Sequence, residues 1–95
     1  MAAQAFGGGP QLSRLTSELV VVNRLPEAVN VYASTVGVGR EVFVGQVEPG
    51  RTDTLAVRGI PAGSSARLRA LPVSGAASLE RDTVRLDAGA RWQLP

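Results

Sequence analysis

Short runs of β-type residues, separated at regular intervals by turn residues, are the feature that most constrains the fold of this chain. From Ser17 onward, turn signals such as Pro49-Gly50 and Asp87-Ala88-Gly89 recur, roughly every ten to twelve residues. This spacing is typical of a β-sandwich or a β-barrel, because each run is long enough for one strand. The expected strands cover residues 18–23, 28–35, 40–47, 52–58, 66–73, 78–86 and 90–94.

The order of apolar and polar side chains predicts which face of each strand is buried. In the run 28–35 the two kinds alternate, so Val29 and Val31 are expected to face the core and Tyr32 to face outward. The run 18–23 is apolar on both faces. We therefore expect it either at the centre of a sheet or covered on its second face.

In the third run, residues 40–47, the pattern does not show which face of the strand points inward. Val42 and Val44 share one face of a regular strand, whereas Phe43 and Val47 share the other. Gly45 lies among them and suggests a β-bulge, because glycine inside a strand often marks one.

The first sixteen residues differ from the rest of the chain. Gly7-Gly8-Gly9-Pro10 is a stretch typical of flexible linkers. The apolar residues Phe6, Leu12 and Leu15 lie on either side of it in the sequence. Residues 1–16 are therefore interpreted as an extended N-terminal arm, either a disordered tail or a segment that docks on a partner. Residues 17–95 are expected to form one all-β domain, an antiparallel β-sandwich of about seven strands.

Composition excludes several kinds of chemistry. The 95 residues contain no Cys, no His and no Lys, and all ten cations are Arg. The usual ligands of zinc, copper and haem are absent, as is the commonest general base, so no cofactor or metal is expected. The net charge is only +2 and acids are interleaved with the arginines, so nucleic acid is not an expected partner.

Membrane insertion is not expected either. No stretch approaches the ~20 apolar residues of a membrane-spanning helix. The first residues also lack the basic segment and the apolar core of a secretory signal peptide.

The pattern of runs resembles a known kind of domain. The segments that carry the resemblance are Asn23, Val29-Asn30-Val31-Tyr32, Phe43 to Gly50, Leu68-Arg69-Ala70 and Asp87 to Trp92. They resemble immunoglobulin-like and transthyretin-like β-sandwiches and are similar to small sandwich domains of bacterial envelope proteins. The resemblance implies an exported protein of the periplasm or cell envelope that serves as an adhesion, carrier or accessory module. It implies no site residues, and fold alone does not give function.

Candidate partner-binding residues come from the arm and from outward-facing strand positions. Tyr is enriched at protein interfaces, so the outward Tyr32 is a candidate, alongside Phe6, Leu12 and Leu15 of the arm. The fifth and sixth runs carry a group of arginines with acids among them. This group is interpreted either as a charge-paired outer face or as a patch that attracts an acidic partner or lipid headgroups. Its members are Arg67, Arg69, Arg81 and Arg85, and Arg67 and Arg69 are the partner-binding candidates.

Three functions follow from these observations. The leading hypothesis is a non-enzymatic accessory or structural subunit, which docks on a larger membrane-associated or envelope complex, or on copies of itself. It would use the arm together with a sheet face or edge. The first alternative is a carbohydrate-binding or small-molecule-binding module using Tyr32, Phe43 or Trp92, although Trp92 is expected in the core. The second alternative is a carboxylate-only hydrolase using Glu80 and Asp82.

The arm interpretation makes a direct prediction. Deletion of residues 1–16 is expected to abolish assembly with the partner while the domain stays folded. Co-purification of the truncated protein with its partner measures the first effect, and thermal melting measures the second. A truncated protein that still co-purifies with its partner rules out a docking arm.

Overall fold

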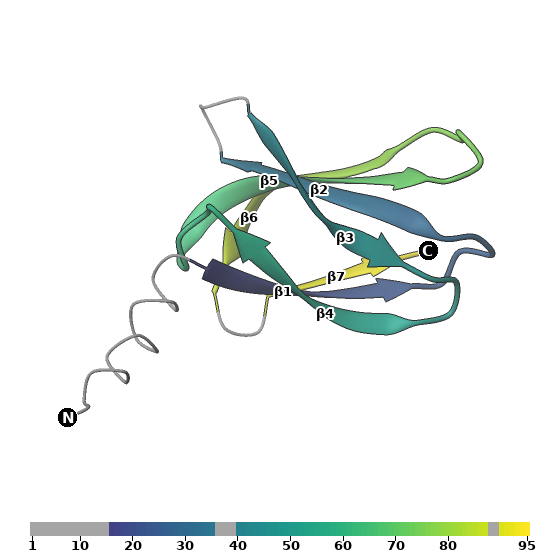
Figure 1. The fold of residues 1–95 in the computed structure, drawn as a ribbon, viewed down its shortest axis with the longest axis horizontal. Helices are drawn as coiled ribbons and strands as arrows, with labels where there is room; N and C mark the ends of the chain where they lie inside the picture. The colour runs from purple at the N-terminus through teal and green to yellow at the C-terminus, as the bar shows by residue number, and fades with distance from the viewer. Residues whose placement is uncertain (1–15, 36–39, 88–89) are drawn as a thin grey trace.

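The computed structural model describes residues 16–35, 40–87 and 90–95, and this part of the chain is built of β-strands without a helix (Figure 1). The strands are β1 (Thr16–Asn23), β2 (Val29–Thr35), β3 (Glu41–Val47), β4 (Thr52–Arg58), β5 (Ser64–Pro72), β6 (Leu79–Leu86) and β7 (Arg91–Leu94).

The strands form two sheets, and their positions confirm the all-β prediction. One sheet has three strands in the order β4-β1-β7, and the other has four in the order β3-β2-β5-β6. The strand ends differ from the expected ones by up to two residues, as in β5, which begins at Ser64. Residues 1–15 lie outside the described part, and β1 begins at Thr16, the last residue of the expected arm.

One strand pairing differs from the expected antiparallel arrangement. Four of the pairings within the sheets are antiparallel, but β7 runs parallel to β1, with Val20 opposite Arg91 and Val22 opposite Gln93. The reason is topological: the chain crosses from β6 in one sheet to β7 in the other and joins β1 from the side that β4 leaves open. An alternation pattern gives no information on which strands become partners.

The core lies between the two sheets, as Figure 1 shows from the side. Val29 and Val31 of β2 are fully buried, as their alternation predicted. Trp92 of β7 is only 6% exposed, which confirms that the indole belongs to the core. β1 lies between β4 and β7, so the run that is apolar on both faces is the central strand of its sheet.

A β-bulge in β3 determines which side chains of this strand face the core. The alternation in the sequence did not settle this. The register shift leaves Val44 without a partner on β2, while Phe43 and Gly45 on either side of it are paired. The extra residue reverses the alternation, so Val47 is fully buried and Phe43 points outward with 60% of its surface exposed. Phe43 and Val47 therefore do not share a face, and the bulge suggested by Gly45 is present.

Gly45 itself makes room for the opposite sheet. A Cβ atom at this position would lie 3.1 Å from Cδ2 of Leu55 on β4. The absent side chain thus lets Leu55 pack directly against the backbone of β3. Glycine inside a strand is usually unfavourable, and this close approach explains its presence.

A second bulge lies in β6, at the other edge of the four-stranded sheet. Two steps along β5, from Ala66 to Leu68, correspond to three along β6, from Val84 to Arg81. Thr83 lies inside this bulge with a φ of 56°. A β-branched residue in the left-handed region is strained, so this bulge stores local backbone strain.

The buried side chain of Asn23, at the end of β1, joins three segments of the chain. Its Nδ2 donates hydrogen bonds to the carbonyl oxygens of Glu27 (2.9 Å), Val47 (3.0 Å) and Glu48 (3.2 Å). Its Oδ1 accepts a hydrogen bond from the backbone N–H of Leu25 at 3.0 Å. The amide group is therefore satisfied as both donor and acceptor in a fully buried position.

The backbone of the same residue fixes the β3–β4 turn. The N–H of Asn23 donates to the carbonyl of Arg51 at 2.9 Å, and the N–H of Gly50 donates to the carbonyl of Asn23 at 2.8 Å. Gly50 has a φ of 75°, which glycine adopts without strain. The turn predicted from Pro49-Gly50 is thus confirmed and is tied to the end of β1.

Substitution of Asn23 by Asp tests the importance of this network. Asp keeps the shape but replaces the donating NH₂ group by an oxygen that faces three carbonyl oxygens. We expect the free energy of unfolding to fall by about 3 kcal/mol, because buried carbonyl groups lose their donors. Urea unfolding measures the loss. Asn30→Asp, on the outer face of β2, is the matched control and is expected to change stability by less than about 1 kcal/mol. Equal losses in both variants would contradict the proposed role.

Candidate functional site

The outer face of the four-stranded sheet carries a row of large side chains from three neighbouring strands. Tyr32 of β2 lies opposite Phe43 of β3 on one side and opposite Arg69 of β5 on the other. The rings of Tyr32 and Phe43 meet edge to face, with centroids 5.6 Å apart and planes at 65°. The guanidinium carbon of Arg69 lies 4.8 Å from the centroid of the Tyr32 ring.

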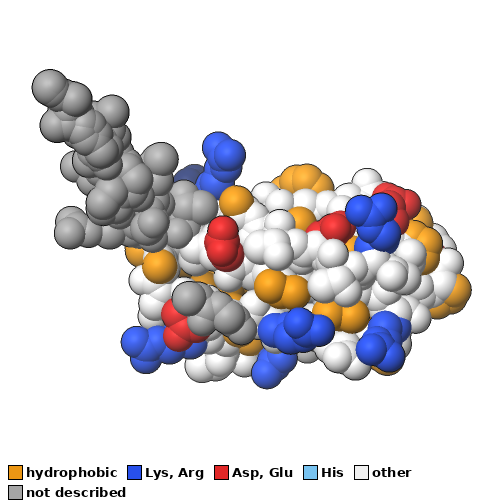
Figure 2. All heavy atoms as spheres, turned by 90° about the horizontal axis from the view of Figure 1, so that it is seen from below, with side chains coloured by type: hydrophobic (Ala, Val, Ile, Leu, Met, Phe, Trp, Pro, Cys, Tyr) orange, Lys and Arg blue, Asp and Glu red, His pale blue; other side chains and the backbone are white. Residues whose placement is uncertain are grey.

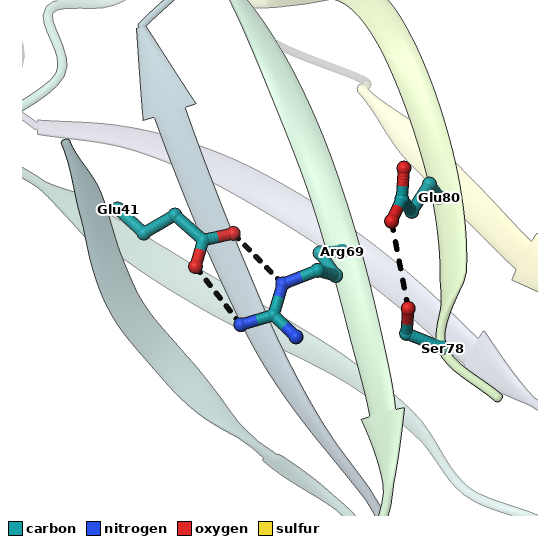
Figure 3. Close-up of polar contacts among 4 residues, drawn as sticks. All are labelled: Glu41, Arg69, Ser78 and Glu80. Carbon is teal, nitrogen blue, oxygen red and sulfur yellow. Dashed lines mark hydrogen bonds and ion pairs between the residues drawn. The ribbon is translucent and has the colours of Figure 1, made fainter. Parts of the chain in front are cut away.

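An ion pair holds Arg69 in this position (Figure 3). Its Nε donates to Oε2 of Glu41 and its Nη2 donates to Oε1, each at 2.9 Å. This two-pronged geometry fits the planar guanidinium and restricts its rotation. We refer to Phe43, Tyr32, Arg69 and Glu41 as the aromatic–arginine cluster.

The electrostatics of the cluster follow from the same contact. The hydrogen bonds from Arg69 hold the pKa of the Glu41 carboxyl below its ordinary value of 4.5, and the charge of Arg69 adds to this effect. The same bonds raise the pKa of Arg69 above its ordinary value. Both groups are therefore charged at neutral pH.

Glu80 of β6 lies next to Arg69 in the register of the sheet. Figure 3 shows its carboxylate directed to Ser78, whose hydroxyl donates to Oε2 at 3.5 Å, and not to Arg69. Asp82, two residues further along β6, forms an ion pair with Arg67 at 2.9 Å. Glu80 and Asp82, the two acids proposed for a hydrolase, are both exposed. Glu80 already contacts Ser78, and Asp82 already pairs with Arg67.

The structure brings together only some of the predicted site residues. Tyr32 and Arg69 belong to the cluster, whereas Arg67 lies beside it in the pair with Asp82. Phe6, Leu12 and Leu15 fall outside the described residues.

The four arginines of the fifth and sixth runs do not form one basic patch. Three of them pair with acids, namely Arg67 with Asp82, Arg69 with Glu41, and Arg85 with Asp87. Arg81 is different: its side chain donates to the backbone carbonyl of Arg91 on β7, at 3.4 Å. The charge-paired interpretation therefore holds for this face of the sheet.

Two residues of the cluster were not among the predicted partner-binding residues. Phe43 was considered only as a sugar-stacking side chain, because the alternation in its run left the exposed face open. No pattern in the sequence points to Glu41, because its ion-pair partner Arg69 is 28 residues away in the sequence. The suspected bulge at Gly45 was the one available clue to the outward direction of Phe43.

Other kinds of site receive little support. The residues that the structure describes contain no group of three or more His, Cys, Asp or Glu side chains arranged to hold a metal ion. Within the same residues, no helix has the length and apolarity needed to cross a membrane.

The chain matches no protein-family model, no curated protein and no solved structure.

The ion pair of the cluster predicts a pH dependence. Because the pKa of Glu41 is lowered on folding, its contribution to stability is present above pH 4.5 and is lost as the pH falls through the lowered value. In an Arg69→Gln variant, the titration midpoint of Glu41 is expected to rise, as observed by NMR of the carboxyl carbon. Arg67→Gln, which leaves the pair intact, is the control. An unchanged midpoint in Arg69→Gln would show that the pair does not form in solution.

Proposed function

We propose that this domain is a non-enzymatic accessory or structural subunit that docks on a larger protein assembly through the outer face of its four-stranded sheet. The observation that carries the proposal is the aromatic–arginine cluster. Phe43 is 60% exposed and lies beside Tyr32 and Arg69, whose positions are already fixed by their neighbours.

The composition and rigidity of the cluster suit a binding surface. Aromatic residues and Arg are enriched at the energetic centres of protein interfaces. Each contact within the cluster contributes only about 0.5–1 kcal/mol to folding at an exposed site, so stability alone is a weak reason for it. Side chains that are ordered before binding lose less conformational entropy on binding. The cluster therefore favours association of the domain with another protein.

The edges of the sheets are less suitable for docking than the face. Bulges interrupt both edge strands of the four-stranded sheet, β3 and β6. In the other sheet, β7 has only four residues, and β4 carries Asp53 opposite the buried Val21. Bulges, short strands and inward-pointing charges are the devices that prevent addition of a further strand. These features support the sheet face as the contact surface.

A carbohydrate site has less support than a protein interface. Sugar rings stack on exposed aromatic faces, and three aromatic residues were candidates for this role. Trp92 lies in the core, and one face of Tyr32 is already covered by Arg69. Phe43 alone presents a largely exposed ring, which fits a single apolar anchor in a protein interface better than a stacking platform.

The strand order bears on the kind of sandwich. An immunoglobulin constant-type domain pairs its first strand with its second, whereas β1 lies between β4 and β7. The strand order therefore differs from that of the constant-type immunoglobulin sandwich. The proposed location in the periplasm or cell envelope depends on the resemblance, and the proposed docking role of the arm, residues 1–16, depends on its sequence.

Phe43→Ser tests the proposed surface. We expect it to weaken association with the native assembly by about 2 kcal/mol or more, because the residue acts as an interface anchor. Its exposed position predicts only a small change in unfolding free energy. Affinity is measured with the assembly purified from its native envelope fraction. Val73→Ser is the matched control, because Val73 is 54% exposed but lies outside the cluster. Equal affinities of Phe43→Ser and Val73→Ser would argue against this face.

A further inference from the structure

The outer face of the three-stranded sheet differs from the cluster face in its charge. The strand register places Val20, Thr54 and Ala56 on this face, and the charged side chains Glu18, Arg58 and Arg91 lie around them. Val20 is half-buried, whereas the three charged side chains are exposed. The face thus carries small apolar and hydroxyl side chains with charged side chains around them.

The arginines at this border are not neutralised within the described part of the chain. Arg58 and Arg91 form no ion pair there, although most arginines of the opposite sheet do. Arg81 adds a third positive charge, because its hydrogen bond to the Arg91 carbonyl brings its side chain to β7. Glu18 is the one acid that the register places on this face.

Figure 2 views the molecule from below Figure 1, on the side where β4, β1 and β7 lie. Blue arginine side chains lie along one border of this view and also at the opposite border, and orange hydrophobic and red acidic side chains lie among them.

From this geometry we infer that the β4-β1-β7 face is a second docking surface, and that its partner is an acidic protein surface. The guanidinium group binds carboxylates with two parallel hydrogen bonds, which favours arginine where Asp and Glu side chains are recognised. Uncompensated positive charges also accelerate the encounter with an acidic partner. The side chains between the arginines, Val20, Thr54 and Ala56, are small, which leaves room for the backbone and side chains of a protein partner.

An acidic protein fits this face better than a membrane does. Peripheral binding to a bilayer combines basic residues with apolar or aromatic side chains that enter the headgroup region. The large exposed hydrophobic residues of the described chain are Phe43 and Val73. Both lie outside the β4-β1-β7 face, in or directly after strands of the other sheet.

The inference is independent of the proposed function, because the two surfaces lie on different sheets. Together they would let one small domain hold an acidic protein on one side and the larger assembly on the other. Failure of one surface leaves the other untouched, since Phe43 is not part of the basic face.

The test uses the full chain and poly-L-glutamate as the probe of carboxylate recognition. In NMR titrations, we expect amide shifts confined to β1, β4 and β7, and we expect them to weaken with added salt. The double variant Arg58→Glu/Arg91→Glu is expected to lose affinity about tenfold or more. Arg67→Glu/Arg85→Glu, which changes the net charge equally on the other sheet, is the matched control and should lose much less.

Three outcomes would overturn the inference. The first is a set of shifts centred on the cluster face, and the second is an equal loss of affinity in the two double variants. The third is tighter binding to vesicles of phosphatidylcholine and phosphatidylserine than to poly-L-glutamate, with the same dependence on Arg58 and Arg91. If Arg58→Glu/Arg91→Glu does not fold, as judged by thermal melting, Arg58→Gln/Arg91→Gln replaces it with a smaller expected loss.

Discussion

The side chain of Asn23 is the contact on which the arrangement of the two sheets depends. It lies at the end of β1, the central strand of one sheet, and it binds backbone groups at the entrance to β2 and at the exit from β3. A buried amide with all its partners tolerates little displacement, because any unsatisfied polar group in the core is costly. The face that carries Phe43 and Tyr32 is therefore positioned by a polar residue on the other sheet.

Much of the fold could be predicted from the sequence because the alternation of side chains reports burial directly. The face of β2, the central position of β1 and the burial of Trp92 all follow from this pattern. The candidate site was only half predictable. The bulge at Val44 reverses the direction of Phe43, and the partner of Arg69 comes from another strand. Both depend on pairing between strands, which a single sequence does not reveal.

The two sheets reach stability and solubility in different ways, and this difference shapes the surface of the domain. Charges on the four-stranded sheet are paired locally, so that its outer face is close to neutral around an aromatic centre. On the three-stranded sheet, Arg58 and Arg91 form no ion pair within the described residues. With strand addition disfavoured at the edges, the two faces are the surfaces that we propose for contacts with other molecules. A protein of this size thereby gains two chemically distinct surfaces.

The parallel pairing of β1 with β7 also bears on how the protein is made. Among the strands that the structure describes, β1 is the first and β7 is the last, and they are neighbours in one sheet. On the ribosome, the early strands emerge while Trp92 and Leu94 are still to be translated. At that stage the core lacks these two side chains. Contacts between residues so distant in sequence slow folding. The domain therefore completes its fold only once β7 has been translated and can pair with β1, and until then that edge of β1 has no partner strand.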